Sequence, residues 1–186
     1  MALTNSAASR SGFAALLASA KPGKSTTRVS PRLTGVTHAA MLPGGGPAPI
    51  ATSQILANAQ QLLNVPYVWG GTSANALDCS AFVSKAWGVG RLTTDNLASV
   101  SGPIGKEELQ PGDALNLTTG KDPDGTGHVR MFDKWANPEH TKLWVYEETP
   151  PKSVHHVINW DAHYQPMRRF NTVAAQDDNS SRNFAP

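Results

Sequence analysis

The chain has 186 residues, of which 39% are hydrophobic and 16% are charged, a composition typical of a globular protein with one core-forming domain. Its formal net charge is only +2, and its early basic residues are scattered without aromatic neighbours, which argues against nucleic-acid binding. A single cysteine excludes an intrachain disulfide framework and a cysteine-rich zinc site. No apolar run approaches the ~20 residues that would span a membrane.

Charged residues are distributed unevenly along the chain. The first 77 residues hold five basic and no acidic residues, whereas the remainder has a net charge of −3. Residues 1–48 are rich in Ser, Ala, Pro and Gly, which predicts a flexible basic tail or leader. Its apolar patch, Phe13–Ala20, leaves three interpretations open: a secretory signal, an organelle transit peptide, or a tail read by delivery machinery. Residues 49–172 are the predicted domain, and 173–186 a polar C-terminal tail.

Two helices are predicted at the start of this domain. Thr52–Asn64 carries apolar side chains at helical spacing, and Thr52 or Ser53 could cap its first turn. Asp78 is a favourable N-cap for a second helix, which runs from Cys79 to about Trp87.

The rest of the domain has the pattern of strands. A turn-forming Pro-Gly-Asp sequence introduces the first strand, and the segment 102–105 is predicted to be a loop. The predicted strands are Ala114–Leu117, His128–Phe132, Leu143–Glu148, Val154–Trp160 and Gln165–Phe170. Helices followed by strands predict an α+β fold, with N-terminal helices packed on a central antiparallel sheet.

The lone cysteine lies where the second helix begins. Backbone N–H groups and the helix dipole at that position favour the thiolate, which is the nucleophilic form of cysteine. A cysteine nucleophile needs a base, and His128, at the start of a strand, is the best placed of the six histidines to face Cys79. His155 and His156 are adjacent on a strand and must therefore point to opposite faces.

A third group should orient the imidazole and stabilise its charged form. Glu147 and Glu148 lie at the end of the next predicted strand, and because they alternate in direction only one can face His128. Strand alternation leaves the choice open, and the other glutamate is expected to face solvent.

Three motifs carry a resemblance to a known family. Pro66–Gly71 together with Leu77–Val83 resembles the nucleophile motif of the NlpC family of papain-like cell-wall cysteine peptidases. Leu109–Asp113 resembles the turn before that family's central strand, and Gly127–Val129 resembles its histidine motif. The similarity runs from about residue 52 to about residue 170.

The resemblance implies a papain-like, NlpC-type α+β fold and a cysteine endopeptidase. It implies that Cys79 attacks a peptide carbonyl, that His128 is the base, and that the Cys79 backbone N–H belongs to the oxyanion site. Aligning Val145-Tyr146 with the family's apolar pair gives Glu147 the orienting position. An enzyme of this type needs neither a metal ion nor a cofactor.

The implied substrate is the stem peptide of bacterial peptidoglycan, cut between γ-D-glutamyl and a diamino acid. Tyr67, Asp78 and Ser80 match positions that line the substrate side in relatives. Three departures are notable. Ala81 replaces a glycine, and Leu92–Asp95 stands where relatives often carry an arginine- or serine-containing substrate segment. Glu147 stands where the family commonly carries His, Asn or Gln.

Two alternative functions differ from a peptidoglycan endopeptidase, either in where the protein acts or in whether it cuts its target. One is a toxin-like amide hydrolase delivered into a rival or host cell, and the other is a phage or secretion-system component that binds wall without cutting it. The first keeps the catalytic triad, whereas the second gives no physical reason for it. The expected location is the cell envelope, the exterior, or a target cell.

Overall fold

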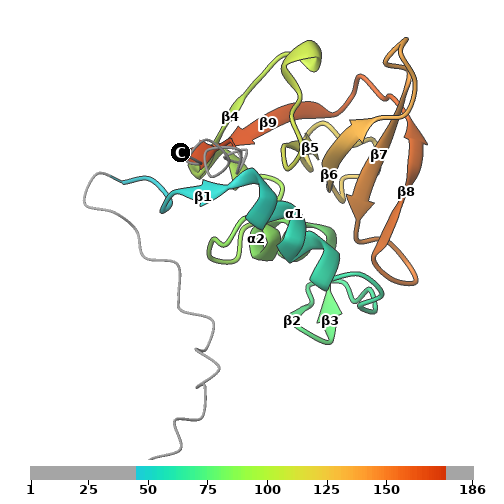
Figure 1. Cartoon of the computed structure of the whole chain (residues 1–186). Coiled ribbons are helices and arrows are strands. Elements are labelled where there is room, and N and C mark those ends of the chain that lie inside the picture. The colour runs from blue at the N-terminus through green and yellow to red at the C-terminus, as the bar shows by residue number, and fades with distance from the viewer. Residues whose placement is uncertain (1–44, 175–186) are drawn as a thin grey trace, which may run out of the picture. The chain divides into compact units, whose positions relative to one another are not determined.

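The computed structural model describes residues 45–174. The predicted tails lie outside this range apart from residues 45–48 and 173–174. Within it, two α-helices cover one face of a six-stranded antiparallel sheet with the order β4-β9-β5-β6-β7-β8 (Figure 1). The elements are α1 (Thr52–Gln61), α2 (Cys79–Ala86), β4 (Ser101–Pro103), β5 (Ala114–Leu117), β6 (His128–Trp135), β7 (Lys142–Glu147), β8 (Val154–Asn159) and β9 (Gln165–Arg169). The predicted α+β fold is confirmed.

Short elements complete this part of the chain. The strand β1 (Ile50–Ala51) pairs in parallel with β10 (Thr172–Val173), and β2 (Thr72–Ser73) pairs with β3 (Ala76–Leu77). Because β10 includes Val173, the folded domain reaches at least one residue beyond the predicted boundary at 172.

The first helix differs from its prediction at both ends. Its N-cap is Ala51, with no capping side chain, and the Thr52 hydroxyl instead donates to the Val173 carbonyl at 3.3 Å. The helix ends at Gln61 rather than Asn64, which adopts a left-handed φ of 66°. In a continued helix the Leu62 carbonyl would accept from the N–H of residue 66, but Pro66 has none. The Leu62 carbonyl instead accepts from the Ser153 hydroxyl at 2.5 Å.

The predicted loop at 102–105 is also wrong in part. Residues Ser101–Pro103 form β4 at the edge of the sheet, paired with β9. Proline is tolerated there because an edge strand has backbone positions that need no N–H donor. Sequence alone favours a loop at a Gly-Pro pair, and the tertiary pairing with β9 overrides it.

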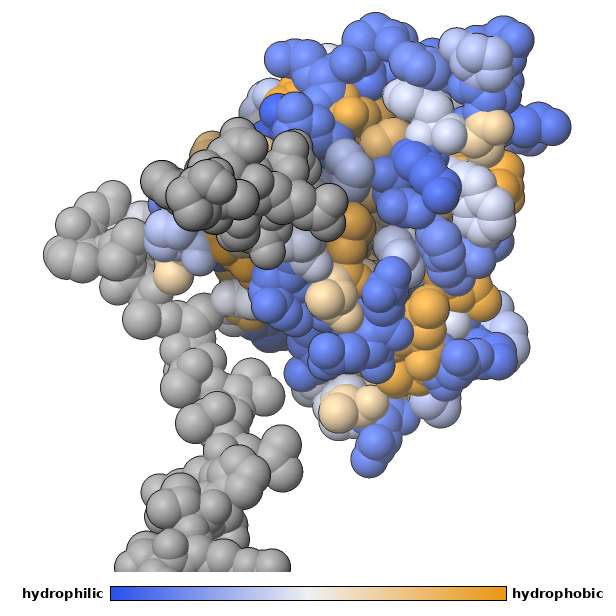
Figure 2. Space-filling model, viewed as in Figure 1, coloured by the Kyte–Doolittle hydropathy of each residue, from blue (hydrophilic) through white to orange (hydrophobic). Residues whose placement is uncertain are grey.

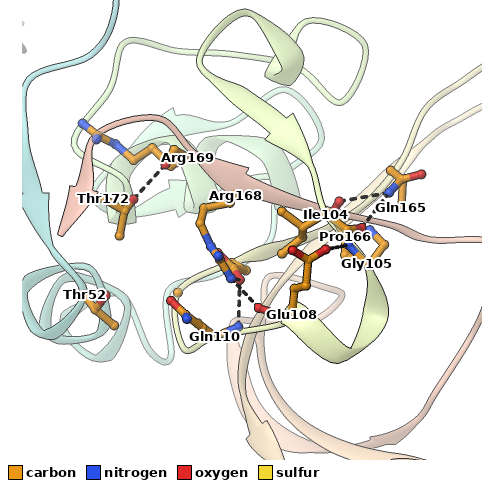
Figure 3. A network of polar contacts seen from close by, with 12 residues as sticks. Thr52, Ile104, Gly105, Glu108, Gln110, Gln165, Pro166, Arg168, Arg169 and Thr172 are labelled. Carbon is orange, nitrogen blue, oxygen red and sulfur yellow. Dashed lines mark hydrogen bonds and ion pairs between the residues drawn. The ribbon is translucent and has the colours of Figure 1, made fainter. Parts of the chain in front are cut away.

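Arg168 on β9 binds the segment that connects β4 to β5. Its guanidinium binds Asp113 through Nε at 3.0 Å and Nη2 at 2.7 Å. It also donates to the carbonyl of Glu108 (Figure 3). In the same connection the Glu108 carboxylate accepts from the N–H of Gly105 at 2.6 Å. This fixes the start of β5, the strand that pairs with the N-terminal end of β6.

Strand alternation divides the core between the two faces of the sheet. On the helix side, Val129 and Met131 of β6 pack with α1 and α2. On the opposite side, Phe132 of β6 packs with residues of β5 and β7 such as Leu115 and Val145. The helices are therefore held against the strand that begins with His128.

The surface seen in Figure 2 is mostly hydrophilic, with apolar residues showing in small groups. The large hydrophobic side chains exposed on the described domain are Val68, Trp69, Val157, Phe170 and Val173. Neither α-helix of residues 45–174 has the length and apolar content that crossing a membrane requires.

Candidate active site

Cys79 is the first residue of α2, as its sequence context predicts. The Asp78 carboxylate caps this helix by accepting from the N–H of Ala81 at 2.7 Å. The Cys79 side chain is largely buried, with 7% of the residue exposed, and it lines a surface pocket. The sulfur thus lies at a capped helix N-terminus and reaches solvent through the pocket.

The loop before α2 approaches its neighbours too closely for a side chain at one position. A Cβ on Gly71 would lie 2.7 Å from the carbonyl oxygen of Ala76 and 2.8 Å from that of Val68. Only glycine fits such a backbone approach. The tight loop brings Tyr67 and Trp69 to the wall of the Cys79 pocket.

His128 connects Cys79 to Glu147. Its Nε2 lies 2.7 Å from Glu147 Oε1, and the imidazole is near enough to the Cys79 side chain for the two groups to interact electrostatically. Since Nε2 is held by Glu147, Nδ1 is the nitrogen that remains for the sulfur. The structure therefore brings together the three residues that the sequence proposed as a triad.

The electrostatics of this group favour charged side chains. Burial alone would lower the pKa of His128, but its interaction with Cys79 and its hydrogen bond to the Glu147 carboxylate raise it to about 9. Burial alone would raise the pKa of Glu147, but the His128 hydrogen bond and the positive charge of Arg130 lower it to about 2. At neutral pH the pair is thus an imidazolium and a carboxylate.

Glu148 points away from His128. It is 0% exposed, and neither carboxyl oxygen has a hydrogen-bond partner among the residues that the structure describes. The expectation that the second glutamate faces solvent is wrong, because Glu148, the residue after β7, is buried in the protein interior. Burial, with the nearby negative charge of Asp78, raises the pKa of Glu148 to about 7.

This burial predicts a pH-dependent penalty on stability. Because the pKa is about 7 in the folded state and 4.5 for the free group, the folded protein binds the extra proton between these values. The stabilising effect of that proton is complete below pH 4.5 and is lost as the pH rises through 7. At about 1.4 kcal/mol per pKa unit, the loss is at most roughly 3 kcal/mol.

Glu148→Gln should remove this dependence. We expect the free energy of unfolding of the variant, relative to wild type, to be higher at pH 8 than at pH 5 by up to roughly 3 kcal/mol. Urea unfolding of both proteins at the two pH values measures it, and comparing variant with wild type cancels the other titrating groups. If the free energy of unfolding changed equally with pH in the variant and in wild type, burial of an ionisable Glu148 would be contradicted.

The three predicted substrate-side residues lie in the same pocket as Cys79. Tyr67, Asp78 and Ser80 all line it. Arg91, which sequence analysis missed, binds Asp78 Oδ2 at 2.6 Å and the Ser80 hydroxyl at 2.9 Å. Arg91 could have been found from its place immediately before Leu92–Asp95, the segment for which the resemblance implies an arginine- or serine-containing sequence.

Residues of that segment form another wall of the pocket. Thr93, Thr94 and Asp95 line it, together with Thr119 and Thr126 of the loop before β6. Asp95 accepts from both the backbone N–H and the hydroxyl of Thr119, at 2.9 and 2.8 Å. The pocket is thus lined by hydroxyl groups on this side.

Two further residues were missed around Glu147. Arg130 Nε lies 3.2 Å from Glu147 Oε1, and its guanidinium stacks over the Tyr164 ring at 4.2 Å. His156 Nε2 lies 2.7 Å from Glu147 Oε2. Arg130 could have been found, since it lies two residues from His128 on the same strand, whereas His156 requires knowledge of the β7–β8 register.

Residues 45–174 contain no group of three or more His, Cys, Asp or Glu side chains placed to hold a metal ion. The polar groups at the site instead pair with one another.

Comparisons with known proteins give a family and three relatives. A probable endopeptidase from Haemophilus influenzae is 33% identical over 93 residues, covering 46% of this chain and 56% of that protein. The probable peptidoglycan endopeptidase LytE from Bacillus subtilis is 32% identical over 84 residues, covering 43% and 24%. The gamma-D-glutamyl-L-lysine dipeptidyl-peptidase from Bacillus cereus is 29% identical over 95 residues, covering 49% and 28%.

The chain thus spans between about a quarter and just over half of the length of these relatives. Among solved structures, an NlpC/P60 family protein from Bacillus cereus gives a TM-score of 0.48 at 21% identity, covering 66% of this chain and 41% of that one. The model of the NlpC/P60 family matches residues 64–140, which include Cys79 and His128 but not Glu147. Through this segment the chain is similar to the NlpC/P60 family.

Proposed function

We propose that this chain is a cysteine endopeptidase that hydrolyses an amide bond in the stem peptides of peptidoglycan. The observation that carries the proposal is the position of His128, which is hydrogen-bonded to Glu147 and interacts electrostatically with Cys79. The names of the relatives, two endopeptidases and a dipeptidyl-peptidase, support the reaction class.

The proposed reaction has two halves. The Cys79 thiolate adds to the carbonyl carbon, and the charge that develops on the oxygen is stabilised by the Cys79 backbone N–H. His128 gives its proton to the leaving amine as the C–N bond breaks, which leaves a thioester. Water then adds to the thioester and gives a proton to His128, and the C–S bond breaks to release the acid and the thiolate.

Glu147 serves this cycle by orienting the ring. Its carboxylate holds Nε2, so that Nδ1 faces the sulfur, and it stabilises the imidazolium that must persist until the amine leaves. The raised pKa of His128, about 9, supports an imidazolium at neutral pH before substrate binds.

The proposed bond lies between γ-D-glutamyl and a diamino acid. The family resemblance and the name of the Bacillus cereus relative, a gamma-D-glutamyl-L-lysine dipeptidyl-peptidase, support this choice. Tyr67, Asp78 and Ser80 would line the substrate side of the pocket, with Arg91 fixing the second and third of these by its two contacts. A wall substrate places the reaction in the cell envelope, outside the cell, or in a target cell reached by delivery.

Mass spectrometry of fragments from purified peptidoglycan of known stem-peptide sequence tests the proposal. We expect fragments that end in γ-D-glutamate, with matching fragments that begin with the diamino acid. The matched control is the same protein alkylated with iodoacetamide, because the chain has one cysteine. Fragments cut elsewhere would refute the proposed bond, and release by the alkylated protein would refute the cysteine mechanism.

A further inference from the structure

The Glu147 carboxylate has partners on both of its oxygens. Oε1 accepts from His128 Nε2 at 2.7 Å and pairs with Arg130 Nε at 3.2 Å. Oε2 lies 2.7 Å from His156 Nε2. The Glu147 side chain is only 7% exposed, so water can replace these contacts only to a limited extent.

The position of His156 follows from strand register. In the antiparallel β7–β8 pair, His156 lies opposite Val145, and Glu147 lies two residues further along β7. Residues two apart on a strand share a face, so the imidazole reaches the carboxylate diagonally. β8 is the last strand of the sheet, and the His156 side chain is 42% exposed.

We propose that His156 is a positioning residue for catalysis, acting through Glu147. His128 and Arg130 both hold Oε1, whereas His156 is the partner of Oε2 in the part of the chain described. A carboxylate held on one oxygen can rotate about its last bond, and Arg130 could then draw it away from the histidine. The second anchor prevents that rotation and keeps Oε1 on His128.

The neighbouring histidine provides a matched control. His155 points to the other face of β8, where it stacks on Tyr146 with ring centroids 4.2 Å apart and binds Asp133 at 3.0 Å. It is therefore a histidine on the same strand with a carboxylate partner of its own, but without contact to Glu147. An effect that is specific to position 156 can be separated from the general cost of altering β8.

The experiment compares His156→Leu, His156→Gln and His155→Gln. The leucine removes the donor, whereas the glutamine can place an amide N–H near the former Nε2 position. We expect His156→Leu to lower kcat about tenfold with little change in KM, because one hydrogen bond to a charged group is lost. His156→Gln should recover most of kcat, and His155→Gln should keep it.

A second readout needs no substrate. The rate at which iodoacetamide alkylates Cys79 reports on the reactive thiolate, and the chain's single cysteine makes the signal unambiguous. We expect His156→Leu to slow alkylation at pH 7 severalfold, with His156→Gln and His155→Gln close to wild type. Thermal melting shows that each variant is folded at the assay temperature.

The outcomes separate this proposal from the proposed function on which its kinetic part rests. Wild-type protein that releases no wall fragments would refute the function, while alkylation would still test His156. Unchanged alkylation and unchanged kcat in His156→Leu would overturn the positioning role. Equal losses in the leucine and glutamine variants, or an equal loss in His155→Gln, would also overturn it, since they would indicate a structural effect of β8.

Discussion

Cys79→Ala will reduce amide hydrolysis to background, a loss of at least about 10⁴-fold in kcat. The sulfur is the atom that forms the thioester in the proposed reaction, and alanine has no group that can replace it. The remaining pocket can still bind substrate, so the loss should appear in kcat and not in KM. Chromatography of fragments released from wall over long incubations measures the residual rate.

The same substitution should leave the fold intact. Cys79 is small and 7% exposed, and removing its sulfur leaves the Asp78 cap on the Ala81 N–H in place. We expect a change in the free energy of unfolding of about 1 kcal/mol or less. Far- and near-ultraviolet circular dichroism should match wild type. A folded Cys79→Ala protein that still cleaves wall would show that Cys79 is not the nucleophile.

Glu147→Gln will have the second largest effect, a fall in kcat of roughly 10²- to 10⁴-fold. The amide has no negative charge to stabilise the His128 imidazolium, and its N–H₂ group can donate to Nε2 and so favour the wrong tautomer. The pKa of His128 should fall from its raised value of about 9. Steady-state kinetics, with nuclear magnetic resonance titration of the imidazole, measure both changes.

Glu148→Gln is the matched control for this prediction. The residue is adjacent in sequence and is also buried, but it faces away from His128 and has no hydrogen-bond partner in the described part of the chain. Its kcat should stay within about twofold of wild type, while its stability changes with pH. If Glu148→Gln lost activity and Glu147→Gln did not, the orienting role would belong to Glu148.

The sequence predicted best where the signal is local. Asp78 caps α2 through an N–H three residues away, and a capping carboxylate before an apolar helical pattern is visible in one dimension. The position of His128 at a strand start is equally local. Together with the single cysteine, these two features indicate which residue is the nucleophile and which is its base.

Features that depend on distant pairing were not predictable in this way. The contact of His156 with Glu147 depends on how β8 registers on β7, and the strand β4 exists because β9, more than sixty residues later, lies beside it. The burial of Glu148 also depends on segments that are distant in sequence. Strand alternation predicts that the two glutamates face opposite ways, but it does not predict that both faces are covered.

The parallel pairing of β1 with β10 has a mechanical consequence. Ile50 and Ala51 lie beside Thr172 and Val173 and run in the same direction, so tension applied between the two ends of this domain would pull the strands past each other. The contacts across this junction would then be loaded together in shear: Ile50 N–H to Asn171, Thr52 to Val173, and Arg169 to Ala48. Shear loading spreads force over several hydrogen bonds at once, whereas peeling breaks them singly. Tension applied between the two ends of the domain would thus be resisted by these hydrogen bonds acting together.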